Sequence, residues 1–367
     1  MFIKQIDRNE LLKPLQAVVG IVERKQPLPI LSNVLIKKNK DGVRFITTDL
    51  EIQIEAQLKA VLDGTESAIT ISAKKLQEIL RAIPDNSTVS LDDQENRLLV
   101  KANKSRFSLQ TLPAQDFPML AEQLVDAAKI EIGQGVLRRL LSSVQYAMAQ
   151  QDIRYYLNGV LLVIDGTSIK LIATDGHRLA FISEELKESH QKQEVILSRK
   201  TVNELLKLLA DSEDKVQLEL AEKQVRISFA DVVLTSKVID GKFPDYNRVI
   251  PTHTNHLTLD RLTILQALQR AAILSNEKFR GVRLLLTEKN LRIISSNSEQ
   301  EEAQEDIENN YSGAPLDIGF NVNYLLDGIN NINTQTITLS FGDQNSSLLI
   351  TIPEKTDYKY VVMPMRI

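Results

Sequence analysis

The stretch Ala173-Thr-Asp-Gly-His-Arg-Leu-Ala-Phe-Ile-Ser183 decides the interpretation of this chain, because it has a relative on either side. Thr47-Thr-Asp-Leu-Glu-Ile-Gln-Ile-Glu-Ala56 lies 126 residues earlier, and Ser295-Ser-Asn-Ser-Glu-Gln-Glu-Glu-Ala303 follows later. Each copy opens with small or polar residues typical of a turn and runs into a segment expected to be a strand. The stretch is therefore predicted to be one copy of a repeated structural unit.

Apolar residues at helical spacing repeat with the same period. The leading leucines of the first helix in each unit, Leu11, Leu137 and Leu262, are separated by 126 and 125 residues. A β-rich segment follows each of these helices, and a second helix comes after the repeated stretch. The six helices are predicted at residues 8–22, 72–84, 134–149, 198–211, 259–274 and 321–333.

A period this long indicates tandem domains rather than a solenoid of short repeats. The predicted fold class is α+β, with three domains that each hold two helices and β-sheets. We place the domains at residues 1–126, 127–254 and 255–367, with boundaries near Asp126 and Thr254. A chain of 367 residues exceeds the usual size of a single core, which agrees with this division.

Composition excludes several classes of protein. The chain has no cysteine, so disulfides, thiolate metal sites and a thiol nucleophile are absent. No apolar run approaches the roughly 18 residues that span a bilayer, and the N-terminal residues lack the pattern of a signal peptide. We expect a cytoplasmic protein that does not associate with a membrane.

Charge is distributed unevenly along the chain. The six predicted helices carry twelve Lys and Arg against six Asp and Glu, although the whole chain has a net charge of −4. Basic helices in an otherwise acidic protein predict that one surface binds a polyanion. Helix surfaces often carry Lys and Arg for solubility alone, which is the plainer interpretation of any single helix. No stacking aromatic accompanies the basic residues, so base-specific contact is not expected.

The sequence contains little that indicates a catalytic site or a metal site. Asp175 and His177 could form an acid–base pair, and a hydrolase that uses them is the rival hypothesis from another functional class. No nucleophile or metal accompanies them. His253 and His256 lie among prolines and threonines typical of a loop, so no metal site and no cofactor are predicted.

The end of the chain is apolar and contains Met363 and Met365. It is either a last strand buried in its own domain or part of a groove for a partner, where flexible methionine suits varied ligands. The acidic run 299–306 is either a solvated face or an ion-pairing edge for a basic strand.

Six motifs are distinctive: Leu28-Pro-Ile-Leu-Ser-Asn, Arg154-Tyr-Tyr-Leu-Asn-Gly159, Thr174-Asp-Gly-His-Arg-Leu179, Asp240-Gly-Lys-Phe-Pro-Asp-Tyr246, Ser275-Asn-Glu-Lys-Phe-Arg-Gly281 and Tyr360-Val-Val-Met-Pro-Met-Arg366. Together they resemble the bacterial DNA sliding clamp family, the beta subunit of DNA polymerase III. The resemblance covers essentially the whole chain, which ends in isoleucine where leucine is common.

The resemblance implies a head-to-tail homodimer ring of six like domains that encircles duplex DNA, with helices lining the hole. It implies a processivity factor without catalysis of its own. Its expected partners are duplex DNA, the replicative polymerase, the clamp loader, translesion polymerases, ligase and mismatch-repair proteins. A monomeric peptide-binding scaffold is the alternative.

The resemblance also assigns residues to three sites. For a peptide-binding groove between domains 2 and 3 it implies Arg154, Tyr156, Leu157, Thr174, Gly176, His177, Arg178, Leu179, Pro244, Arg248, Val249, Asn321, Tyr324, Ser347, Val362, Met363, Pro364, Met365 and Arg366. For the dimer interface it implies Lys75, Arg106, Phe107, Ile273, Leu274, Glu299, Glu302 and Glu305. The DNA-contact set is Arg24, Lys25, Gln151 and Tyr155, to which the basic helix 198–211 adds Arg199 and Lys200.

Overall fold

The computed structural model describes residues 2–23, 28–60, 66–121 and 124–367. Within these ranges, six α-helices lie where helical spacing predicts them. They are α1 (Arg8–Val18), α2 (Ala73–Ala82), α3 (Gln134–Ser142), α4 (Arg199–Leu208), α5 (Arg261–Ile273) and α6 (Val322–Asn330). Helix α3 ends before its predicted limit, where Ser142 and Ser143 donate their hydroxyls to the carbonyl of Arg139 at 2.9 and 2.8 Å. Such side-chain bonds compete with continuation of the helix.

The strands of the described residues form three antiparallel sheets. The 12-stranded sheet has the order β1 (Ile3–Asp7), β6 (Thr88–Gln94), β7 (Arg97–Ala102), β8 (Ser105–Leu112), β5 (Ser67–Ser72), β2 (Asn33–Asn39), β3 (Gly42–Thr48), β4 (Ile52–Lys59), β14 (Val232–Lys237), β13 (Gln224–Phe229), β12 (Lys215–Leu220) and β9 (Ala128–Gly133). The six-stranded sheet has the order β10 (Gly159–Thr174), β11 (Arg178–Ser198), β22 (Tyr358–Val362), β21 (Leu348–Thr351), β20 (Thr336–Phe341) and β15 (Asn255–Asp260). The four-stranded sheet has the order β18 (Glu302–Glu308), β17 (Asn290–Ser296), β16 (Gly281–Thr287) and β19 (Leu316–Asn321).

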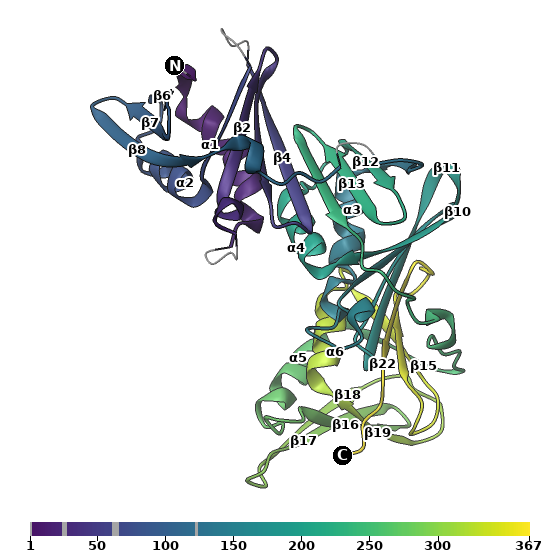
Figure 1. Ribbon diagram of the computed structural model, residues 1–367. Coiled ribbons are helices and arrows are strands. Elements are labelled where there is room, and N and C mark those ends of the chain that lie inside the picture. The colour runs from purple at the N-terminus through teal and green to yellow at the C-terminus, as the bar shows by residue number, and fades with distance from the viewer. Residues whose placement is uncertain (1, 24–27, 61–65, 122–123) are drawn as a thin grey trace. The chain divides into compact units, whose positions relative to one another are not determined.

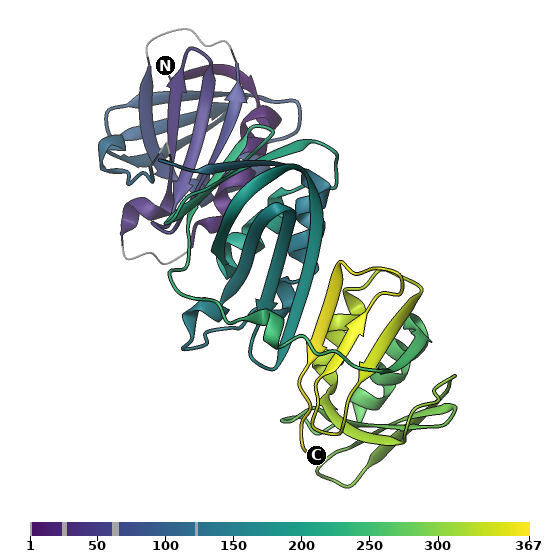
Figure 2. The same cartoon turned by 90° about the vertical axis from the view of Figure 1, so that its right-hand side faces the viewer.

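The chain divides into two compact units, which are described separately. The first consists of Met1–Leu137 and Asn203–Val238 and holds the 12-stranded sheet. In it, α1 and α2 pack on each other and against strands β2 to β5, as Figure 1 shows. The second consists of Arg138–Val202 and Ile239–Ile367. There, α5 and α6 pack on each other and contact strands of both the six-stranded and the four-stranded sheet (Figure 2).

The repeated stretch is the turn and outgoing strand of a hairpin in all three copies, as the sequence predicts. The hairpins are β3–β4, β10–β11 and β17–β18. Two of the outgoing strands accept a strand from a later part of the chain: β14 pairs with β4, and β22 pairs with β11. The third, β18, is an edge strand of its sheet in the described part of the chain.

Strand β8 corresponds in the first repeat to β14 and β22 in the later repeats. Each of these strands pairs with the strand that precedes it in the sequence: β8 with β7, β14 with β13, and β22 with β21. Strand β8 pairs with β5 only through Leu112 and Thr111. Residues 105–110 of β8 therefore also present an open edge among the residues described. In the same residues, no helix is both long and apolar enough to cross a membrane.

Candidate functional site

A cavity of about 510 Å³ lies in the second unit, where β11 begins and β22 ends. Its lining combines an apolar floor with a polar rim. The lining residues are Arg154, Leu157, Thr174, Gly176, Arg178, Leu179, Phe243, Pro244, Tyr246, Arg248, Val249, Asn345, Ser347, Val361 and Met363.

The floor of the cavity is the exposed side of a packed core. Leu157, Leu179, Phe243 and Val361 belong to one cluster of buried apolar residues, and Tyr246 packs against that cluster. Because these side chains are fixed by their neighbours, the cavity exists before any ligand enters. A preformed apolar pocket with a few polar groups at its rim is typical of a ligand-binding site.

One wall of the cavity is the turn between β10 and β11. The hydroxyl of Thr174 donates to the carbonyl of Arg178 at 2.6 Å and accepts the backbone N–H of Gly176 at 3.1 Å. The Asp175 carboxylate accepts the backbone N–H groups of His177 and Arg178 at 2.9 and 3.0 Å. Gly176 has a φ of +89°, a conformation that glycine adopts without strain.

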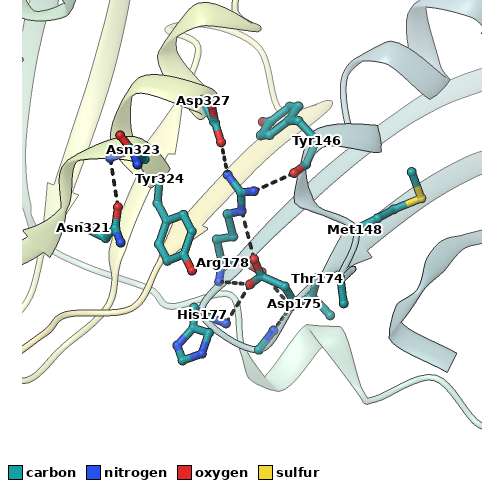
Figure 3. Close-up of polar contacts among 12 residues, drawn as sticks. Tyr146, Met148, Thr174, Asp175, His177, Arg178, Asn321, Asn323, Tyr324 and Asp327 are labelled. Carbon is teal, nitrogen blue, oxygen red and sulfur yellow. Dashed lines mark hydrogen bonds and ion pairs between the residues drawn. The ribbon is translucent and has the colours of Figure 1, made fainter. Parts of the chain in front are cut away.

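Arg178 connects this turn to the C-terminal part of the unit (Figure 3). Its guanidinium donates to the Asp175 carboxylate at 3.1 Å, to the carbonyl of Tyr146 at 2.7 Å, and to the carboxylate of Asp327 on α6. The same group lies over the ring of Tyr324, 4.6 Å from its centroid. These contacts fix the first residue of β11 against α6.

Buried tyrosines surround the arginine. The hydroxyls of Tyr146 and Tyr358 share a hydrogen bond of 2.7 Å, and the hydroxyl of Tyr360 donates to the carbonyl of Tyr324 at 2.8 Å. Burial raises the pKa of the Tyr146, Tyr358 and Tyr360 hydroxyls. Burial also opposes the charge of Arg178, but Tyr360 and Asp327 outweigh it and raise the pKa of the guanidinium above its ordinary value.

The polar rim carries two arginines that are held by nearby aspartates. Arg154 donates two hydrogen bonds to Asp152, at 3.0 and 2.9 Å, and these bonds lower the pKa of the Asp152 carboxyl to about 2. Arg248 forms an ion pair of 3.1 Å with Asp245. Both arginine side chains remain substantially exposed, so they are accessible to a ligand.

The structure brings most of the groove residues that the resemblance implies to this cavity, and it places the others close by or elsewhere. His177 stacks on Tyr324, with ring centroids 6.2 Å apart, and Asn321 accepts the N–H of Asn323 at the start of α6 (Figure 3). Met365 and Arg366 lie at an adjoining, more polar cavity. The remaining predicted residues that do not line the first cavity are Tyr156, Val362 and Pro364.

Sequence reasoning missed four lining residues, which are Phe243, Tyr246, Asn345 and Val361. Val361 and Val362 are both fully buried, but only Val361 lines the cavity, because successive strand residues point to opposite faces. The two-residue period of a strand puts Val361 on the face opposite to Tyr360 and Val362, and this period contains the signal.

Residues predicted to contact DNA lie in different settings. Gln151 and Tyr155 are exposed, whereas Arg199 donates to the carbonyls of Met148 and Ala149 at 3.2 Å each. Burial lowers the pKa of Arg199. Lys200 lies beside it in α4, and Arg24 and Lys25 lie outside the described residues.

Residues predicted for a dimer interface lie on the two open strands and near them. Arg106 and Phe107 are on β8, Lys75 is exposed on α2, and Ile273 at the end of α5 is 76% exposed. Leu274 follows Ile273 as the C-cap of α5. Glu299, Glu302 and Glu305 lie on β18 or just before it. Glu305 already pairs with Arg270 of the same chain at 2.6 and 2.8 Å.

The candidate acid–base pair has structural roles. Asp175 accepts two backbone N–H groups and the Arg178 guanidinium, and His177 stacks on Tyr324. His253 lies 2.8 Å from the carbonyl of Ser347. Within the described ranges, no group of three or more His, Asp or Glu residues could hold a metal ion.

Comparison with known proteins gives matches over the full chain. Family models of the DNA polymerase III beta subunit match as its N-terminal domain at residues 1–121, its central domain at 131–245 and its C-terminal domain at 247–366. The beta sliding clamp of Pseudomonas aeruginosa is 43% identical over 364 residues, and that of Escherichia coli is 40% identical over 363. Each alignment covers 99% of both chains.

Solved structures give the same result. The DNA polymerase III subunit beta of Pseudomonas aeruginosa has a TM-score of 0.96 and 43% identity, over 99% of this chain and 100% of that one. A crystal structure of the same clamp bound to griselimycin has a TM-score of 0.95 and 43% identity, over 99% of both chains. The beta sliding clamp of Caulobacter crescentus has a TM-score of 0.94 and 37% identity, over 99% of this chain and 98% of that one.

Proposed function

The chain belongs to the DNA polymerase III beta subunit family, and from this premise we propose which residues carry out the work of a sliding clamp. The family is a processivity factor without catalysis of its own, and the chain acts in DNA replication as such a clamp. We assign ring closure to β8 and β18, DNA contact to the helices, and partner docking to the cavity. The preformed apolar cavity is the observation that carries the docking assignment.

Ring closure follows from the way in which the chain already joins its own repeats. Strand β14 covers the edge of β4, and β22 covers the edge of β11. The third outgoing strand, β18, and the first closing strand, β8, have open edges among the described residues. We propose that β8 of one protomer pairs with β18 of a second copy, and that two such junctions close a head-to-tail dimer.

The apolar residues near these strands supply the larger part of the closure energy in this proposal. Phe107 on β8 would pack against Ile273 and Leu274. These apolar contacts would outweigh the ion pairs, because an exposed ion pair contributes only about 0–1 kcal/mol. The charged residues set the polarity of the junction. They are Lys75 and Arg106 on one side and Glu299, Glu302 and Glu305 on the other.

Sedimentation of a variant tests this interface. Phe107→Asp places a charge at the centre of the apolar contact, and we expect a monomer at micromolar concentration where the unmodified protein is a dimer. Val125→Asp is the matched control, because Val125 is 81% exposed and outside the proposed interface. A Phe107→Asp variant that remains a dimer contradicts the assignment.

The proposed DNA-facing surface is the basic layer of helices. Helices α1 to α5 all carry Lys or Arg, whereas α6 carries none. Phosphate contact without base reading suits a ring that slides, and we include Gln151, Tyr155, Arg199, Lys200 and the loop residues Arg24 and Lys25. We expect retention on nicked circular duplex DNA and release when that circle is linearised; equal retention on both contradicts encirclement.

The cavity in the second unit is proposed as the docking groove for short peptides of replication and repair proteins. The related clamp of Pseudomonas aeruginosa binds griselimycin, and we propose that the same compound enters the cavity of this chain. Leu179→Asp puts a carboxylate into the apolar floor and should abolish binding in calorimetry. Leu284→Ala is the control, because Leu284 is buried in another sheet. Unchanged affinity of Leu179→Asp contradicts this assignment.

The remaining parts of the proposal concern organisation and partners. Domains at residues 1–126, 127–254 and 255–367 agree in number with the three family models. The proposed partners are the replicative polymerase, the clamp loader, translesion polymerases, ligase and mismatch-repair proteins. They act on DNA in the cytoplasm, where we place this chain.

A further inference from the structure

The last five residues, 363–367, connect the cavity to the four-stranded sheet. The backbone N–H of Met363 donates to the carbonyl of His177 at 2.8 Å, beside the cavity. Two residues later, the N–H of Met365 donates to the carbonyl of Gly319 at 2.8 Å. Strand β19 is at the edge of its sheet, so the tail uses backbone groups that this edge leaves open. Figure 1 shows the C-terminus beside β19.

Two glycines lie under the end of the tail. Gly281 pairs with Asn321, and Gly319 pairs with Arg283, on neighbouring positions of β16 and β19. Residues two apart in a strand share a face, so both glycines lie on the outward face of this ribbon. Phe320, the residue after Gly319 on β19, points to the other face and is fully buried. We call Gly281 and Gly319 the glycine seat.

The tail approaches the glycine seat too closely for side chains there. A Cβ atom at Gly319 would lie 2.5 Å from the backbone oxygen of Met365 and 2.7 Å from Cδ1 of Ile367. A Cβ atom at Gly281 would lie 3.0 Å from Cδ1 of Ile367. Glycine inside a strand often marks a place where another backbone comes close.

Backbone conformation does not explain these glycines. The glycines of the described residues with positive φ are Gly42, Gly166, Gly176 and Gly241. Neither member of the glycine seat is among them, so alanine fits the strand conformation at both positions. A substitution there reports on the contact with the tail alone.

We propose that Gly281, Gly319 and Ile367 are positioning residues that hold the tail in register and thereby keep Met363 on the wall of the docking groove. The inference rests on the proposed docking function. Met363 lines the cavity and is 44% exposed, so no packing around it fixes its place fully. The backbone N–H of Met363 donates to His177 on one side, and the bond from Met365 to Gly319, two residues on, holds the tail on the other side. Ile367 is itself 63% exposed, although its side chain contacts both glycines.

Methyl NMR of methionine observes the tail directly. The chain has five methionines, of which Met363 and Met365 are in the tail and Met119 and Met148 are internal references. In Gly319→Ala, the backbone of Met365 must move, so both tail signals should shift while those of Met119 and Met148 stay. Gly133→Ala is the matched control, because a Cβ there meets nothing closer than 3.5 Å.

Griselimycin affinity tests the consequence for the groove. We expect Gly319→Ala to weaken binding about tenfold, as loss of a preorganised wall does, and Gly133→Ala to leave it unchanged. Gly281→Ala should weaken binding by less than about threefold, because only the side chain of Ile367 must turn away. Circular dichroism on heating should show the same midpoint for all three variants.

A double-mutant cycle separates the two seat positions. The three atoms nearest a Cβ at Gly281 all belong to the Ile367 side chain. In an Ile367→Ala background, Gly281→Ala should therefore change neither the tail signals nor the affinity. Gly319→Ala should still act there, because the backbone oxygen of Met365 remains in its way.

The outcomes distinguish this inference from the docking proposal. If the unmodified protein does not bind griselimycin, the docking proposal fails, and the tail signals alone decide whether the seat holds the tail. Tail signals in Gly319→Ala that match those of the unmodified protein overturn the inference. So does a shifted tail with undiminished griselimycin affinity, because Met363 would then need no positioning.

Discussion

The turn at residues 48–52 and the turn at 174–178 have the same hydrogen bonds and different surroundings. Thr48 donates to the carbonyl of Ile52 at 2.9 Å, as Thr174 does to that of Arg178 at 2.6 Å. Asp49 accepts the N–H of Ile52 at 2.8 Å, as Asp175 accepts that of Arg178 at 3.0 Å.

The difference lies in the residues that the common geometry does not require. Leu50 has a φ of +77° where Gly176 has +89°, and buried Ile52 stands where Arg178 donates to α6. Threonine and aspartate therefore build the turn in both places. The side chains at the other positions decide whether it packs into a core or lines a groove.

Replacing Arg178, the arginine of the second turn, should have the largest effect on the free energy of unfolding. Arg178→Met leaves the Asp327 and Asp175 carboxylates without their partner, and loss of a largely buried charge partner costs about 3–5 kcal/mol of unfolding free energy. Urea denaturation followed by circular dichroism measures this loss. The control is Arg292→Met, whose 2.9 Å pair with Asp306 is exposed and should cost at most about 1 kcal/mol. If both variants lost the same free energy of unfolding, Arg178 would stabilise the fold no more than a surface residue does.

The second largest effect is expected when Gly176 in the second turn is replaced by leucine, the residue at the equivalent position of the first turn. Gly176→Leu forces a left-handed leucine, which costs roughly 1–2 kcal/mol, and its Cβ would lie 3.2 Å from the Arg154 guanidinium. The protein should fold, since Leu50 occupies the same conformation, but griselimycin binding should fall by more than about tenfold. Calorimetry with the unmodified protein as reference decides this. Full affinity would show that the close approach at Gly176 has no role in docking.

The two threonines should behave alike. Thr48→Val and Thr174→Val each remove a buried hydroxyl that donates one bond and accepts another, which costs about 1 kcal/mol of unfolding free energy in either turn. Parallel urea titrations compare them. A difference of more than about 1 kcal/mol would break the equivalence of the turns.

Leu50→Gly should have the smallest effect. Relief of left-handed strain is offset by the greater chain entropy of glycine when unfolded, so the free energy of unfolding should change by less than about 1 kcal/mol. Griselimycin affinity should not change, because this turn lies in the other unit. A marked loss of stability would mean that the Leu50 side chain, 37% exposed, packs more firmly than its exposure indicates.

Much of the fold could be predicted from the sequence, because the repeat fixes the order of elements. The helices and the three hairpins lie where periodicity places them. The buried tyrosines around Arg178 could not be foreseen, since Tyr146 and Tyr358 are far apart in the chain and meet only after β22 joins β11. The position of Ile367 outside the cavity depends equally on a tertiary contact, because it rests on Gly281 and Gly319.

Most cavity residues were assigned by the family resemblance, whereas local pattern alone identified only the turn. The turn at 174–178 was identified from its repeat, but its polar residues look catalytic until their hydrogen bonds are known. Phe243 and Tyr246 line the cavity from a connecting segment with no periodic pattern. Strand alternation did contain the distinction between Val361 and Val362.

The pairing of β4 with β14 has a consequence for anyone who divides the chain into pieces. A fragment that ends at Asp126 would keep β4 but lose β14, uncovering an edge with the buried residues Ile52, Ile54 and Ala56. Exposed apolar strand edges invite aggregation. We therefore expect a fragment of residues 1–126 to aggregate more readily than one that also includes β12 to β14.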